Sequence, residues 1–163
     1  MSPTDYVDCD ALDLAELVRS GQASPAELLD EALARTAAVN PQINAVIHLM
    51  EARARDAIAA GLPDGPFRGV PFLIKDLMTA YAGEPMRCGS RLFKDFVPPE
   101  DEELTRRYRA AGLVIFGGFT IVDFNLLRRS TPDAAVPIAA GTFLDIFSVF
   151  LLATAGLASL TLA

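Results

Sequence analysis

The chain has 163 residues, of which 52% are hydrophobic, and a formal net charge of −7 at pH 7. An apolar fraction this large is not typical of an intrinsically disordered protein, because it provides enough side chains for a core. The negative charge argues against nucleic-acid binding, which needs a basic patch. The two cysteines, Cys9 and Cys88, are too few and too far apart for a disulfide framework or a zinc site. We therefore expect a cytoplasmic protein without metal or cofactor, either one domain or a piece of a larger protein.

Two helices are predicted near the N-terminus. The amphipathic pattern of residues 11–21 ends in a glycine, which is common just after a helix. The second helix begins after Ser24, and Glu27 completes a capping box in which each side chain accepts a hydrogen bond from the other residue's backbone N–H. We expect Asn40-Pro41 to end this helix, because a residue before proline is disfavoured in the helical conformation.

The middle of the chain alternates between strand and helix patterns. The predicted elements are strand 43–49, helix 51–60, strand 70–74, a helix from residues 100–103 to 111, and strand 113–116. The connection 79–99 is long and irregular, and segments of this kind often carry function. The order strand, helix, strand predicts a βαβ unit, so we expect an α/β fold with a mixed or parallel sheet and helices on its faces.

A lysine closes the second predicted strand. Lys75 follows the apolar run 70–74 directly and precedes Asp76. Lysine is rarely buried, so two interpretations are open. The local sequence alone favours a surface ion pair at the end of the strand, whereas a partly desolvated amine at this place could act as a base. We expect Asp76 to accept hydrogen bonds from nearby backbone N–H groups.

Two other features are weaker candidates for a site. His48 is the only histidine, so any mechanism that needs one would have to use it. It lies in an apolar run with no partner nearby in the sequence, which favours a structural role. Gly117-Gly118 follows a predicted strand and could bind phosphate, but it lacks the lysine and serine of a P-loop.

Read together, these segments resemble the amidase signature family in order and spacing. The most specific motif is Gly-Val-Pro-Phe-Leu-Ile-Lys-Asp, at residues 69–76. The other matching segments are residues 15–21, 24–29, 39–46, 65–68, 89–90 and 109–117. Within the family, the first helices are most similar to the 6-aminohexanoate cyclic-dimer hydrolases. The resemblance covers residues 12–124 and implies the N-terminal part of the family fold.

The resemblance also implies an activity and a role for Lys75. Members of the family hydrolyse linear or cyclic amides, or transfer ammonia from an amide, with a Ser-cisSer-Lys triad. Lys75 matches the triad lysine, which in its neutral form acts through a bridging serine to deprotonate the nucleophilic serine. The implied partner is a small-molecule amide substrate, and no cofactor is implied.

The serine part of the family pattern is missing from these 163 residues. The family carries both serines in a stretch such as Gly-Gly-Ser-Ser-Gly-Gly, and the chain has no such stretch. The serines that follow Lys75 have other surroundings: they are Ser90, Ser130, Ser148 and Ser159. We therefore expect residues 1–124 to be the N-terminal portion of an amidase domain and residues 125–163 to be a divergent tail, of the kind that a frameshift produces. Such a fragment would be inactive alone and prone to self-association, because sheet edges would lack their neighbours.

The tail leaves an alternative open. Residues 146–163 contain no charged side chain, and they just reach the about 18 residues that a transmembrane helix requires. The missing basic and aromatic flanks weaken that interpretation. The alternative is a non-catalytic binding or membrane-attached protein that reuses an amidase N-terminal region. In a third interpretation, a separate polypeptide supplies the serines.

Overall fold

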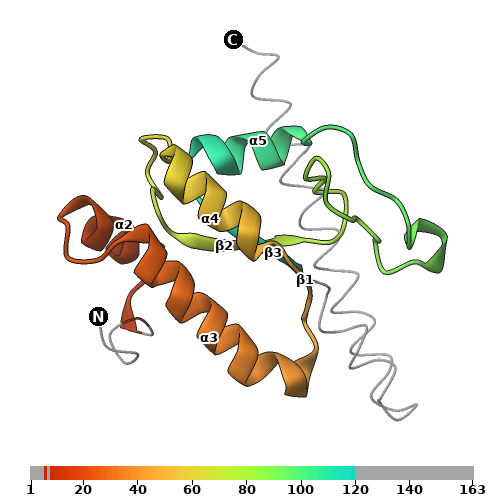
Figure 1. Ribbon diagram of the computed structural model, residues 1–163, viewed down its shortest axis with the longest axis horizontal. Coiled ribbons are helices and arrows are strands. Elements are labelled where there is room, and N and C mark those ends of the chain that lie inside the picture. Colours follow the sequence, from red (N-terminus) through yellow and green to blue (C-terminus); the bar gives the residue numbers. More distant parts are fainter. Residues whose placement is uncertain (1–5, 7, 120–163) are drawn as a thin grey trace, which may run out of the picture. The chain divides into compact units, whose positions relative to one another are not determined.

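The structure is a computed structural model that describes residue 6 and residues 8–119 (Figure 1). Its elements, in chain order, are α2 (Ala11–Arg19), α3 (Pro25–Ile43), β1 (Val46–Leu49), α4 (Glu51–Ala60), β2 (Pro71–Lys75), the 3-10 helix η1 (Arg91–Phe93), α5 (Glu103–Ala110) and β3 (Val114–Phe119). The proposed tail and its apolar run 146–163 lie outside the described residues. None of the helices in the described part combines the length and apolar character that crossing a bilayer requires.

The three strands form one mixed sheet in the order β1-β3-β2. β2 and β3 are parallel and are connected through α5, whereas β1 is antiparallel to β3. The predicted α/β class and the predicted parallel βαβ pair are therefore confirmed. Since β3 is the central strand, its first five residues are all buried, as expected for a strand covered on both faces.

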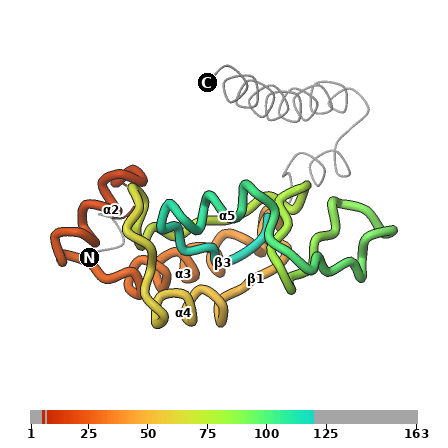
Figure 2. Tube along the Cα trace, turned by 90° about the horizontal axis from the view of Figure 1, so that it is seen from above, coloured from red at the N-terminus to blue at the C-terminus, as the bar shows by residue number. Residues whose placement is uncertain are grey.

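Helices cover both faces of β3. Val114 and Phe116 belong to a buried cluster with residues of α3 and α4. Ile115 points to the opposite face, where it packs with Ile74 of β2 and with Tyr108 of α5. Figure 2 shows α4 and α5 on opposite sides of β3. This arrangement explains why apolar residues follow one another in β3 without the alternation of a half-exposed strand.

Helix α3 begins as predicted. The hydroxyl of Ser24 accepts the backbone N–H of Glu27 at 3.2 Å, and the Glu27 carboxylate accepts the backbone N–H of Ser24 at 2.8 Å. These two bonds form the expected capping box. Each satisfies a donor that has no partner within the helix itself.

The predicted end of α3 is wrong. The helix passes through Pro41 and ends at Ile43. A proline removes one backbone hydrogen bond of the helix. Close to the C-terminal end of α3, tertiary contacts can offset this cost. Asn44 then ends the helix in the left-handed conformation, with φ of 50°, which asparagine adopts more readily than most residues. The side-chain amide of Asn40 donates to the carbonyl oxygen of Val46 at 2.9 Å and accepts the backbone N–H of Val46 at 2.8 Å. Val46 is the first residue of β1.

Gly117-Gly118 lies within β3. The prediction that the pair follows the strand is therefore wrong. The pair therefore forms no phosphate-binding loop. Glycine usually weakens a strand unless another backbone approaches closely, and such an approach is present. A β-carbon on Gly117 would lie 2.7 Å from the backbone oxygen of His48 in β1.

Candidate functional site

Lys75 is the last residue of β2 and is half-buried. The carboxyl ends of the parallel strands β2 and β3 reach the same edge of the sheet, where Lys75 pairs with Phe119. Within the described part of the chain, the Lys75 ammonium group makes neither a hydrogen bond nor an ion pair. The surface ion pair that the local sequence favours is therefore not formed with any acid described here.

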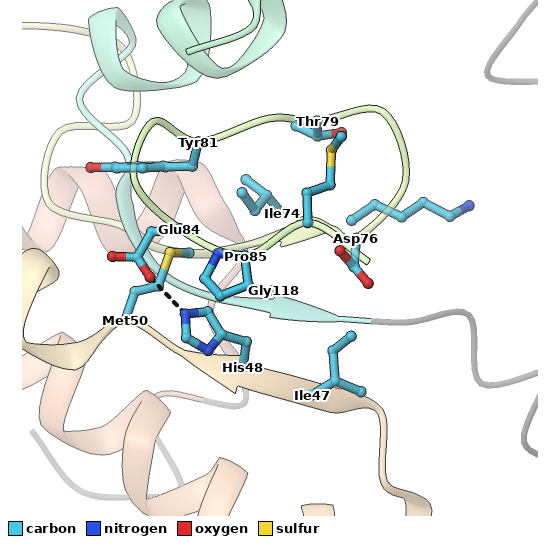
Figure 3. A pocket seen from close by; sticks show the side chains of 12 residues that line it. Ile47, His48, Met50, Ile74, Asp76, Thr79, Tyr81, Glu84, Pro85 and Gly118 are labelled. Atoms are coloured by element: carbon cyan, nitrogen blue, oxygen red, sulfur yellow. Dashed lines mark hydrogen bonds and ion pairs between the residues drawn. The ribbon is translucent and has the colours of Figure 1, made fainter. Parts of the chain in front are cut away.

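A small pocket lies beside Lys75 (Figure 3). Its wall consists of residues from β1, β3, the end of β2 and the connection that follows β2: Ile47, His48, Met50, Ile74, Lys75, Asp76, Thr79, Tyr81, Glu84, Pro85, Met86 and Gly118. The open volume of about 20 Å³ has room for about one water molecule. An amide substrate would need a larger site, so this pocket can form only a corner of one.

Asp76 joins the sheet edge to the connection between β2 and α5. Its Oδ1 atom accepts a hydrogen bond from the backbone N–H of Arg87 at 2.7 Å. Its own backbone N–H donates to the carbonyl oxygen of Phe119 at 2.8 Å. The expected role of Asp76 as an acceptor for backbone donors is confirmed. Its Oδ2 atom is buried and has no hydrogen-bond partner among the described residues.

His48 has a partner that sequence reasoning missed. Its Nε2 atom lies 2.6 Å from Oε2 of Glu84, which is 36 positions away in the chain. Figure 3 shows this contact across one side of the pocket. The contact exists only because the connection after β2 passes over β3 to reach β1. It supports the structural role expected for His48.

Two arginines contact the ring of Tyr81, which lines the same pocket. Arg53 of α4 also pairs with Glu84, and its guanidinium carbon lies 5.6 Å from the centre of the Tyr81 ring. Arg109 of α5 lies 5.6 Å from the same ring centre and pairs with Asp101. The hydrogen bond that Arg109 donates to the Asp101 carboxylate raises the pKa of Arg109, which keeps the guanidinium charged.

No group of three or more His, Cys, Asp or Glu side chains suited to a metal ion is present within the described residues. The chemistry visible at the pocket is that of an amine, a carboxylate and a histidine–carboxylate pair.

The family model for amidases matches residues 27–135. The matched segment contains β2, Lys75 and all the residues of the pocket. This chain belongs to the amidase family.

Curated relatives of this chain agree with the match. The 6-aminohexanoate-cyclic-dimer hydrolase of Paenarthrobacter ureafaciens is 42% identical over 127 residues, which are 77% of this chain and 25% of the relative. The 6-aminohexanoate-cyclic-dimer hydrolase of Pseudomonas sp. (strain NK87) is 38% identical over 127 residues, again 77% of this chain and 25% of the relative. The chain thus spans about a quarter of the length of these relatives.

Solved structures confirm the fold. A 6-aminohexanoate cyclic dimer hydrolase complexed with substrate matches with a TM-score of 0.64 and 40% identity, over 68% of this chain and 23% of that chain. A bacterial aryl acylamidase of the amidase signature family matches with a TM-score of 0.61 and 28% identity, over 68% of this chain and 25% of that one. The resemblance seen in the sequence, and the expected amidase signature fold, are both correct.

Proposed function

We propose that this chain carries the lysine base of a Ser-cisSer-Lys amidase site, Lys75, and lacks the two serines that the base acts on. As a consequence, the chain is inactive in amide hydrolysis by itself. The observation that supports this assignment is the position of Lys75, at the end of β2 beside the pocket and without a partner among the described residues. The absence of a Gly-Gly-Ser-Ser-Gly-Gly stretch from the 163 residues supports the second part.

In a complete site the reaction is an acyl transfer. The neutral amine of Lys75 takes a proton from the bridging serine, which takes one from the nucleophilic serine. The nucleophilic oxygen attacks the amide carbon, the amine leaves with a proton, and water hydrolyses the acyl-enzyme. The substrate is a linear or cyclic small-molecule amide, and the chemistry requires no cofactor.

Ser90 does not meet the requirements for either serine. Its hydroxyl accepts the backbone N–H of Leu92 at 3.2 Å and so caps η1. Ser90 therefore has a local structural role. The other serines after Lys75, which are Ser130, Ser148 and Ser159, lie outside the described residues.

An activity assay on the full chain tests the proposal directly. The purified chain and its Lys75→Ala variant are incubated with linear amides and with the 6-aminohexanoate cyclic dimer. We expect no hydrolysis above the no-enzyme background from either protein. Robust turnover by the wild-type chain that Lys75→Ala abolishes would overturn the proposed inactivity, and turnover that survives the substitution would also remove Lys75 from the mechanism.

A chimera gives the complementary positive test. Residues 12–119 replace the equivalent segment of the P. ureafaciens hydrolase, which supplies the remainder of the enzyme. We expect the chimera to hydrolyse the cyclic dimer, and Lys75→Ala to lower the rate by about 100-fold or more, the typical effect of a general base. Lys94→Ala, at the only other lysine that this chain contributes to the chimera, is the matched control and should leave the rate unchanged.

A non-catalytic, membrane-attached protein remains the alternative that the uncharged run 146–163 favours. Cell fractionation separates the two, since recovery in the membrane fraction would favour attachment. Translation of the coding DNA beyond residue 124 in the other two frames adds a second check. A Gly-Gly-Ser-Ser-Gly-Gly stretch there would favour a frameshifted amidase, whereas the same stretch on a neighbouring chain would favour a split enzyme.

A further inference from the structure

The connection between β2 and α5 has little regular structure of its own. Its only helical turn is η1, and Leu92 in that turn exposes 84% of its surface. A segment of this kind takes its conformation from the contacts that tie it to the rest of the fold. Its first part nevertheless forms one wall of the pocket beside Lys75, through Glu84, Pro85 and Met86.

One carboxylate ties this wall to two elements on the far side of the central strand. Glu84 accepts a hydrogen bond from His48 of β1 through Oε2 and pairs with Arg53 of α4 through Oε1. The Glu84 side chain is only 16% exposed. Exposed ion pairs contribute little to stability, but a half-buried carboxylate that uses both oxygens on two partners is held in one geometry.

The residues just before Glu84 are held from the opposite side. The backbone N–H of Ala82 donates to Oδ1 of Asp101 at 2.8 Å, and Asp101 pairs with Arg109 of α5. The guanidinium groups of Arg53 and Arg109 both contact the ring of Tyr81. The segment 81–84 is therefore attached to α5 through Asp101 and to β1 and α4 through Glu84.

We propose that Glu84 is a positioning residue that holds the connection across the sheet against His48 and Arg53, and thereby shapes the pocket at Lys75. Its bearing on catalysis rests on the proposed function. When the carboxylate is lost, the wall formed by residues 84–86 separates from β1 and the Lys75 amine becomes more accessible. The sequence motif of the family contains Lys75 and Asp76, whereas the Glu84 contacts emerge only from the folded chain.

The lysine content of the chain permits a selective test. Lys75 and Lys94 are its only lysines, and the Lys94 side chain is 73% exposed. The full chain is treated briefly with N-hydroxysuccinimide acetate, and mass spectrometry gives the ratio of acetylated Lys75 to acetylated Lys94. In Glu84→Gln we expect this ratio to rise by about threefold or more, because local opening exposes the amine.

Glu51→Gln is the matched control. It removes the same charge from α4, where Glu51 pairs, among the described residues, only with Arg55 in an exposed i,i+4 contact, and it should leave the ratio at the wild-type value. Hydrogen exchange supplies the second readout, since amides of segment 81–87 should exchange faster in Glu84→Gln alone. If Glu84→Gln does not fold, Arg53→Met removes one of the two partners and should give a smaller change in both readouts.

An unchanged ratio together with unchanged exchange in Glu84→Gln, or in Arg53→Met where the first variant does not fold, would overturn the proposal. Equal changes in Glu51→Gln would also overturn it, because they would indicate a general effect of charge. Acetylation needs no turnover, so the outcome is independent of the activity assays. A chimera that is insensitive to Lys75→Ala would overturn the proposed function and leave the role of Glu84 in the fold standing.

Discussion

The backbone oxygen of His48 lies so close to Gly117 that a β-carbon at this position would be 2.7 Å away from it. At the adjacent Gly118, the nearest atom of the described residues to an added β-carbon is the Ile74 backbone oxygen at 4.0 Å. The two neighbouring glycines of β3 therefore differ in what they permit. Only the first is required for the close approach of β1 and β3.

This difference predicts opposite tolerance to alanine. Gly117→Ala must push the backbones of β1 and β3 apart, and we expect it to lower the free energy of unfolding by about 1–3 kcal/mol. Gly118→Ala meets no close atom of the part of the chain that the structure describes, and should change the free energy of unfolding by about 0.5 kcal/mol or less. Urea unfolding of both variants measures the difference. Equal effects would show that the close contact is not what selects glycine at position 117.

Asp76→Ala should release the connection from the sheet edge. The substitution leaves the backbone N–H of Arg87 without its acceptor, which we expect to cost about 1–3 kcal/mol of stability. Asp95→Ala is the matched control in the same connection, since the Asp95 side chain is 85% exposed. Hydrogen exchange at the Arg87 amide is the direct readout. Protection of this amide that persists in Asp76→Ala would contradict the assignment.

Thr105→Val should stabilise the protein. Thr105 of α5 is fully buried, and its hydroxyl has no hydrogen-bond partner in the part of the chain described. Replacing an unsatisfied hydroxyl by a methyl group of similar size should raise the free energy of unfolding by about 1 kcal/mol. Thr79→Val should have the opposite sign, because the buried Thr79 hydroxyl donates to the carbonyl oxygen of Leu77. Calorimetry on both variants tests the pair, and two shifts of the same sign would refute this interpretation.

The capping box predicts a pH-dependent contribution from Glu27. The hydrogen bond from the Ser24 backbone N–H, and then that from its hydroxyl, lower the pKa of Glu27 below its ordinary value of 4.5. A lowered pKa in the folded state means that the stabilisation is present above that ordinary value and is lost as the pH falls through the folded-state value.

Comparison with Glu27→Gln isolates this contribution, because glutamine keeps an acceptor oxygen without the charge. We expect wild type to exceed Glu27→Gln in stability at neutral pH, and the difference to shrink as the pH is lowered below 4.5. Chemical unfolding at a series of pH values measures it. A difference that stays constant over this range would mean that the Glu27 charge is not involved.

Features of this protein that depend on neighbouring residues can be predicted from its sequence. The Ser24–Glu27 capping box and the bounds of α4, Glu51–Ala60, follow from local hydrogen bonding and helix propensity. The apolar run 70–74 predicted a buried strand. A strand, β2, does form at Pro71–Lys75, but of its residues only Ile74 is buried. Lys75 could therefore be chosen as a candidate, and the role of Asp76 as an acceptor anticipated, from the chain alone.

Features that join different elements become visible only in the folded chain. Helix α3 continues through Pro41 to Ile43, although the residue before a proline is disfavoured in the helical conformation. Gly117 is part of a strand because another backbone lies against it. Glu84 meets His48 because the connection crosses the sheet. Each of these results is set by packing between elements, whose energy is not carried by any one stretch of sequence.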